Sequence, residues 1–144
     1  MWKRYWPGAR KSTEKPRIKL KHVLVRNLSY SHVRPVLVPY CSSFFCQLRG
    51  LTFRKRIAPE DGLLLVQRRD SRLDAAIHML FVFTDLAVAW IDGAGVVVDT
   101  CLARRWRPFY VPRHPARYVL EMSPDRFEDF HPGDRVSIEQ ADQD

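Results

Sequence analysis

The sequence predicts a mainly β protein, at the margin of the α+β class. We expect a compact small β-barrel, or a strongly curved antiparallel or mixed sheet, with two short helices. Short apolar runs rich in β-branched and aromatic residues are separated by proline, glycine and aspartate, which favour turns. These runs lack a clean alternation of apolar and polar side chains, so their strands should be covered on both faces. The 144 residues suffice for one domain with a real core.

Eight segments carry the strand pattern. Prolines bound the segment 35–40, which suits an edge strand or the end of a strand. Segments 77–83 and 86–91 should pair as an antiparallel hairpin that turns at residues 84–85. Residues 93–95, with two glycines, should carry the next reversal. The predicted strands are 22–27, 35–40, 63–66, 77–83, 86–91, 96–98, 116–122 and 135–139, with a polar surface loop at 67–74.

Two short helices complete the prediction. The first is indicated by Phe44, Phe45 and Leu48, which share one helical face, and Gly50 follows where a left-handed C-terminal cap is needed. The second should begin at residues 123–125, where serine is the N-cap, proline takes the first helical position and aspartate lies in the first turn.

The positive charge is concentrated at the N-terminal end. Residues 1–35 hold ten basic side chains and one acidic side chain, a net charge of +9, whereas residues 36–144 carry −1. Proline, glycine, serine and threonine are interspersed among these charges in residues 1–20. We therefore expect a flexible basic arm over residues 1–20 and a single mainly β domain over residues 21–144.

The cysteines and the hydropathy pattern bear on location. The three cysteines are an odd number, and four residues separate Cys41 from Cys46. Both are therefore expected to be small hydrophobic side chains, in a reducing compartment, and not partners in a disulfide or a zinc site. No window reaches the roughly 18 uncharged apolar residues that a spanning helix needs. A secretory signal is also not visible. The expected location is cytoplasmic, with membrane association as an option.

The order of several motifs resembles one protein family. The stretches are "QLRGLTFRKRI", "EDGLLL", "IHMLFVFTDLAVAWIDGAGVVV", "PARYVLEM" and "HPGDRVSIE". Together they resemble the bacterial and archaeal domain of unknown function 192 family over about residues 23–139. The resemblance implies a compact, mainly β domain with short helices, and no assigned activity. Val82 replaces the family's characteristic methionine, and Ala87 replaces an expected aspartate. A functional site lined by those side chains in relatives would be weakened here.

His78 is the catalytic candidate, because it matches the family's histidine. The favoured interpretation is a buried core histidine held by one hydrogen bond. A nucleophilic arrangement of His78 with Cys101 and Asp99 is the less favoured alternative. The five histidines lack metal-site spacing, and no glycine-rich phosphate-binding motif is present. We therefore expect no metal and no cofactor.

Residues 104–117, "RRWRPFYVPRHPAR", interleave five arginines with three aromatic residues. This pattern suits stacking on single-stranded bases together with phosphate contacts. The favoured interpretation is simpler: a long connection whose aromatic side chains pack on the sheet while its arginines face solvent. The weaker binding candidates in this segment are Arg104, Arg105, Trp106 and Arg107.

The leading functional expectation is a non-enzymatic binding or accessory module. Its basic arm would contact a polyanion, either nucleic acid or an anionic membrane surface. The alternative is an enzyme of unknown reaction with a pocket near His78. A cavity beside His78 would favour the enzyme, and a filled interior would favour the module. The sequence does not indicate an oligomeric state. The predicted polyanion-binding residues are Lys3, Arg4, Arg10, Lys11, Lys15, Arg17 and Lys19.

Overall fold

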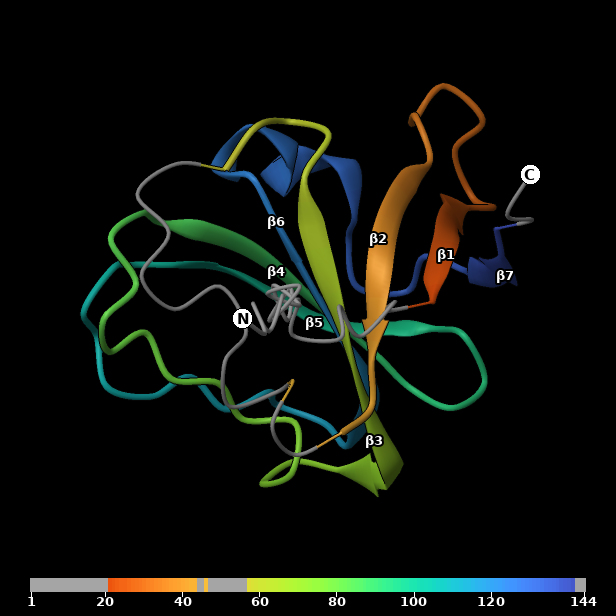
Figure 1. Ribbon diagram of the computed structural model, residues 1–144. Helices are drawn as coiled ribbons and strands as arrows, with labels where there is room; N and C mark the ends of the chain where they lie inside the picture. The colour runs from red at the N-terminus through yellow and green to blue at the C-terminus, as the bar shows by residue number, and fades with distance from the viewer. Residues whose placement is uncertain (1–20, 44–45, 47–56, 142–144) are drawn as a thin grey trace, which may run out of the picture.

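The described residues form one curled seven-stranded sheet with a short 3-10 helix (Figure 1). The computed structural model describes residues 21–43, 46 and 57–141. The sheet order is β5-β4-β6-β3-β2-β1-β7. A mainly β, strongly curved mixed sheet is therefore confirmed. The elements are β1 (His22–Asn27), β2 (Val36–Cys41), β3 (Gly62–Ser71), β4 (Leu86–Ile91), β5 (Val97–Ala103), β6 (Ala116–Met122), η1 (Pro124–Asp129) and β7 (Val136–Gln140).

All neighbouring strands pair antiparallel except β2 and β3, which are parallel. The strand β2 lies between β1 and β3, so of the two alternatives for residues 35–40 the edge strand was wrong. Pro35 lies directly before the first residue of the strand, as the other alternative allowed. The parallel ladder to β3 involves only Tyr40 and Cys41. The Tyr40 N–H donates to the carbonyl of Lys21, on the β1 side. Pro39 precedes the β3 ladder, and its missing N–H therefore interrupts no bond there.

The predicted hairpin of residues 77–83 with β4 is wrong. Both edges of β4 are occupied, by β5 and by β6. Of residues 77–83, only Ile77 forms a bridge, to Tyr110 outside the sheet. The reversal at residues 93–95 is confirmed, because Gly95 has a φ of +82° and its N–H donates to the carbonyl of Asp92.

Three other elements differ in length or type from the prediction. One is β5, which runs to Ala103 although only residues 96–98 were predicted as a strand. The strand β3 continues to Ser71, so residues 67–71, expected in a loop, extend the strand with mostly exposed side chains. The predicted helix start at Ser123 is confirmed: its hydroxyl accepts from the Asp125 N–H, although the helix is of the 3-10 type. The first predicted helix, apart from Cys46, and the cap at Gly50 lie outside the described residues, as does the arm of residues 1–20.

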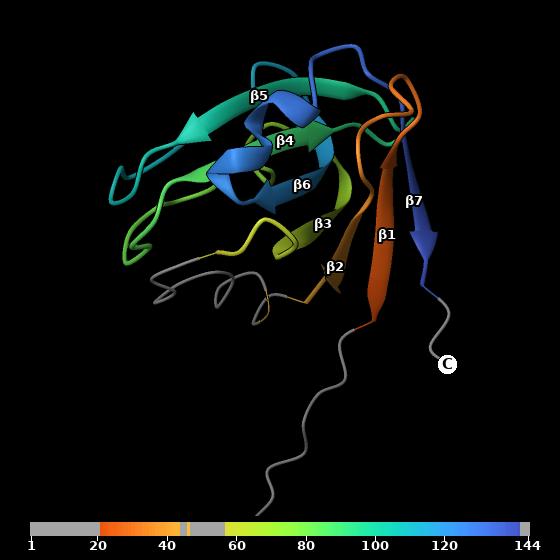
Figure 2. The ribbon, with the colours of Figure 1, turned by 90° about the horizontal axis from the view of Figure 1, so that it is seen from above.

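Buried side chains cover both faces of the central strands, as the apolar runs predicted. In β4, Leu86, Val88 and Trp90 belong to one core, which we call the outer core. The alternate residues Ala87, Ala89 and Ile91 belong to the other, which we call the inner core. The inner core joins β1, β2, β7 and the end of η1. The outer core is covered by the connections that include Ile77 and Met79. Figure 2 shows η1 beside β4 and β5, where the sheet curves round.

The two edge strands meet at one end of the curl. The Val97 N–H donates to the Asp134 carbonyl at 2.9 Å, and the Val136 N–H donates to the Gly95 carbonyl at 2.8 Å. These bonds tie the start of β5 to the start of β7 and partly close the curled sheet. Within the described part of the chain, no helix is long and apolar enough to span a membrane.

Candidate functional site

Two long connections lie side by side over the outer core. They are residues 72–85, between β3 and β4, and residues 104–115, between β5 and β6 (Figure 1). Ile77 and Tyr110 exchange two backbone hydrogen bonds, of 3.0 and 2.9 Å. The Met79 N–H donates to the Arg107 carbonyl, and the Met79 carbonyl accepts from the Trp106 N–H. The backbones of the two connections are therefore fixed to each other.

Asp85 and Tyr110 fix the beginning of the second connection. One Asp85 oxygen accepts from the Arg105 N–H at 2.9 Å, and the other lies 3.1 Å from a guanidinium nitrogen of Arg104. The backbone bond from Arg105 is the largest cause of the lowered pKa of Asp85, and the Arg104 interactions add to it. The Tyr110 hydroxyl accepts from the Arg104 N–H at 2.7 Å. This corner is therefore held by side chains as well as by the backbone.

Two aromatic residues at this place adopt left-handed backbone conformations. Phe81 has a φ of +60° and Trp106 a φ of +65°. Bulky L-residues rarely occupy this region, because the Cβ crowds the following carbonyl. The Phe81 and Trp106 rings pack edge to face with centroids 5.4 Å apart, and the Phe83 ring lies 5.3 Å from that of Trp106. The two connections are thus also joined through their rings.

These rings and the exposed residues that flank Trp106 in the chain make up one group. We call it the aromatic–arginine face and define it by Phe81, Phe83, Arg104, Arg105, Trp106, Arg107 and Phe109. The exposed fraction is 49% for Phe81, 46% for Trp106 and 70% for Phe109. The favoured interpretation, with these aromatic side chains packed on the sheet, was therefore wrong for Trp106 and Phe109. Tyr110 alone is half-buried against the outer core.

The structure brings the predicted candidates Arg104, Arg105, Trp106 and Arg107 together with two residues that the sequence did not indicate. Phe81 and Phe83 were assigned to a buried strand, and their rings instead meet Trp106. The one available signal was that apolar and polar side chains do not alternate in residues 77–83. This pattern did not distinguish a strand of the sheet from a segment that covers the face of the sheet. The arm candidates from Lys3 to Lys19 lie outside the described residues.

His78 is exposed, so its prediction as a buried core histidine was wrong. Ile77 and Met79 on either side are buried in the outer core, and His78 between them faces solvent. The nucleophilic alternative also lacks support. Burial, with a smaller contribution from Asp99, raises the pKa of the Cys101 thiol to about 12. A protonated thiol is a poor nucleophile. The Asp99 carboxylate accepts from the N–H groups of Thr100 and Arg113.

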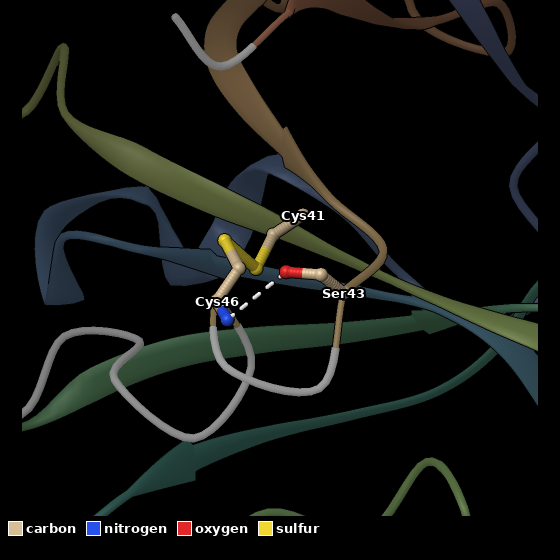
Figure 3. The surroundings of a disulfide bond; sticks show 3 residues. All are labelled: Cys41, Ser43 and Cys46. Carbon is tan, nitrogen blue, oxygen red and sulfur yellow. Dashed lines mark hydrogen bonds between the residues drawn. A yellow bond between two sulfur atoms is a disulfide. The ribbon is translucent and has the colours of Figure 1, made fainter. Parts of the chain in front are cut away.

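Cys41 and Cys46 form a disulfide, contrary to the sequence prediction (Figure 3). Their Cα atoms are 5.7 Å apart, a separation that suits a disulfide. The chain turns where β2 ends at Cys41, and the Cys46 N–H donates to the Ser43 hydroxyl at 3.2 Å. This turn brings together two cysteines that spacing alone did not pair. Cys101 is a free cysteine.

Glu121 is a buried acid on β6 that the sequence did not single out. It pairs in register with Leu63 of β3 and Val88 of β4, two residues of the outer core. Burial raises the pKa of its carboxyl group to about 7. Among the described residues, no cluster of three or more histidine, cysteine or acidic side chains could hold a metal ion.

Comparison with known proteins places these features in a family. The sequence pattern of DUF192, described as an uncharacterized ACR, matches residues 27–138. A UPF0127 protein of Thermococcus gammatolerans is 39% identical over 84 residues, which are 58% of this chain and 53% of that protein. A UPF0127 protein of Thermococcus kodakarensis is 34% identical over the same length, with 58% and 52% covered. The chain thus spans about half the length of these relatives.

Two solved structures share the fold. One is a proposed transcription regulator from Sinorhizobium meliloti 1021, with a TM-score of 0.71, 20% identity, and coverage of 82% of this chain and 92% of that chain. The other is a protein of unknown function from Novosphingobium aromaticivorans, with a TM-score of 0.67, 19% identity, and coverage of 81% and 83%. At these identities the likeness concerns the fold alone. The match over residues 27–138 shows that this chain belongs to the domain of unknown function 192 family.

Proposed function

We propose that this protein is a non-enzymatic binding module for polyanions, and that the aromatic–arginine face is the contact surface of its folded body. One observation carries the proposal. Asp85 fixes the backbone at Arg105 and pairs with Arg104, while the side chains of Arg105 and Arg107 stay exposed. Neither of these two guanidinium groups forms an ion pair with another described residue, and that of Arg107 lies over the Tyr110 ring, 5.7 Å from its centroid. Both can therefore receive phosphate, sulfate or carboxylate groups.

The basic arm is the second part of this proposal. Its support is the charge distribution, +9 over residues 1–35 against −1 over the remainder. Such an asymmetry favours rapid, salt-dependent attraction of an anionic partner. We assign this attraction to the arm residues Lys3, Arg4, Arg10, Lys11, Lys15, Arg17 and Lys19. The partner classes are nucleic acid and an anionic membrane surface.

Two observations weigh against an enzyme centred on His78. The histidine is exposed, and its neighbours Ile77 and Met79 fill the outer core beneath it. The Cys101 thiol stays protonated, since its pKa is raised to about 12. The prediction of a cytoplasmic location relied on reduced cysteines. The Cys41–Cys46 disulfide removes that support, because disulfides persist mainly in oxidising compartments.

Binding of the full chain to heparin tests the function, because heparin is a polyanion without bases or lipid. We expect binding that weakens steeply with salt, and a weaker interaction for the double variant Arg105→Gln, Arg107→Gln. The matched control is Arg68→Gln, Arg135→Gln, which removes the same charge from exposed positions on β3 and next to β7. Equal weakening by both double variants would exclude the face as the contact surface. No binding by the unmodified chain at low salt would exclude the function itself.

A further inference from the structure

We propose that the aromatic–arginine face is a stacking site for the unpaired bases of a single-stranded nucleic acid. This inference rests on the proposed polyanion-binding function and names the ligand class of the same surface. Phosphates would contact Arg105 and Arg107, and a base would lie against the ring of Trp106.

Strained backbone is concentrated at this face. Within the described residues, Phe81 and Trp106 are the only non-glycine residues with positive φ. They come from different connections, yet their rings touch. Strained conformations of this kind persist where surrounding structure imposes them, and they concentrate at functional sites. About half of each side chain is exposed, so both rings are accessible to a ligand.

The backbone around Trp106 is preorganised. Met79 is fully buried, and its backbone N–H and carbonyl bind Arg107 and Trp106 respectively. One anchored residue therefore fixes the backbone on both sides of the Trp106 ring. Asp85 fixes the preceding two residues by its bonds to Arg104 and Arg105. A surface held in this way loses little conformational entropy when a ligand binds.

The side chains of the face suit bases and phosphates together. An exposed tryptophan can stack on a base of any identity, because every base has a π-face. The charges beside it are arginines, whose planar guanidinium groups bind phosphate bidentately and stack on bases. A lysine ammonium has no planar group that could stack on a base, whereas a membrane surface attracts either cation. The three arginines of the face, Arg104, Arg105 and Arg107, therefore favour nucleic acid over lipid.

The shape of the face favours a single strand over a duplex. The face is built from two loop segments of the described chain, and neither a helix nor a strand projects from these segments to enter a groove. In a duplex the base faces are already stacked and closed to a protein ring. Only unpaired bases can lie against Trp106, so the ligand is single-stranded.

The test compares three probes with the full-length chain: a fluorescein-labelled oligo(dT) of 12 nucleotides, heparin, and vesicles of phosphatidylcholine with phosphatidylserine. Trp106→Ala should weaken oligo(dT) binding by about tenfold, the range typical of one stacked base. Its heparin affinity and the salt slope for oligo(dT) should stay unchanged, since the indole ring neutralises no phosphate. Trp106→Phe should retain most of the oligo(dT) affinity. Leu73→Ala is the control, because Leu73 is an 80% exposed apolar residue on the same pair of connections.

Each other outcome would overturn either the stacking site or the polyanion-binding function. An unchanged oligo(dT) affinity for Trp106→Ala, with intact heparin binding, would refute stacking and leave the polyanion function standing. Loss of vesicle binding without loss of oligo(dT) binding would identify a membrane contact instead. Absence of binding to all three probes would remove both proposals. If Trp106→Ala does not fold, Phe109→Ala replaces it, because Phe109 is the most exposed ring of the face.

Discussion

The backbone conformation at Trp106 favours glycine, although the residue there is a tryptophan. At a φ of +65°, glycine is tolerated without a Cβ clash, whereas any L-residue is strained. Trp106→Gly should therefore be more stable than Trp106→Ala by about 1 kcal/mol. Urea unfolding of the two variants measures this difference. The same pair at Thr100, within β5, should show the ordinary order, with alanine more stable than glycine. Glycine as the less stable residue at both positions would show that Trp106 is not strained.

Glu121 should make stability fall as the pH rises. The pKa of its carboxyl group is about 7 in the folded state, above the ordinary value near 4.5, because the group is buried. The folded state thus keeps a proton that the unfolded state has already lost between these pH values. The free energy of unfolding should therefore decrease as the pH rises from about 4.5 towards 7, by roughly 3 kcal/mol at most.

The variant Glu121→Gln should lack this pH dependence. The difference in free energy of unfolding between the variant and the unmodified protein should therefore shift in favour of the variant when the pH is raised from 5 to 8. Urea midpoints at the two pH values provide the measurement. Glu60→Gln is the control, because Glu60 is an exposed acid in a turn and should change little. The same decline with pH in Glu121→Gln would assign the effect to another group.

The cysteines should differ in reactivity. With Cys41 and Cys46 joined, the unreduced and unfolded chain should show one thiol to Ellman's reagent, and the reduced chain should show three. In the folded protein the single thiol, Cys101, should react slowly near pH 7, because its pKa is about 12. Three reactive thiols without reductant would contradict the disulfide.

Elements with local determinants were predicted well. β1 and β6 have the bounds read from the sequence, and Ser123 caps η1 as expected. Residues 77–83 failed for a physical reason: apolar, β-forming composition does not tell a strand in the sheet from a segment covering its face. The two edges of β4 are filled by β5 and β6, and no local pattern encodes that competition.

The buried polar junction of β1, η1 and β7 should be a sensitive point of the fold. Asp134 accepts from the Asn27 side chain and from the His131 N–H, both at 2.8 Å, and is almost fully buried. Asp134→Ala leaves these donors without their acceptor, which should cost about 2–4 kcal/mol in the free energy of unfolding. Thermal and urea unfolding measure the loss. His131→Ala, at an exposed side chain, should cost far less, and equal losses would disprove the role of the carboxylate.

At the scale of the whole molecule, the sequence indicated only part of the candidate site. The interleaved pattern at residues 104–107 was recognisable because cations and aromatics follow one another along the chain. Phe81 and Phe83 were not, since their place beside Trp106 depends on the backbone bonds of Met79 to the other connection. A site assembled from two loops over one core cannot be read from either loop alone.

The charge asymmetry predicts that binding and folding can be separated near residue 20. Deleting residues 1–19 removes seven of the ten basic side chains within residues 1–35. The melting temperature should barely change, because a segment so rich in charged, proline and small polar residues has too little apolar area to offset the entropy of ordering it. Affinity for oligo(dT) should fall, and the log–log salt slope should decrease by about 0.7 for each phosphate that the protein no longer neutralises.

The weakening caused by Trp106→Ala should persist in the truncated chain, because the aromatic–arginine face lies wholly within residues 81–109. The matched comparison is a full-length chain with the seven arm residues Lys3, Arg4, Arg10, Lys11, Lys15, Arg17 and Lys19 changed to glutamine. It should bind like the truncated chain if charge alone matters. An unchanged affinity with an unchanged salt slope in both variants would confine polyanion binding to Arg105, Arg107 and their neighbours, and the arm would have no part in it.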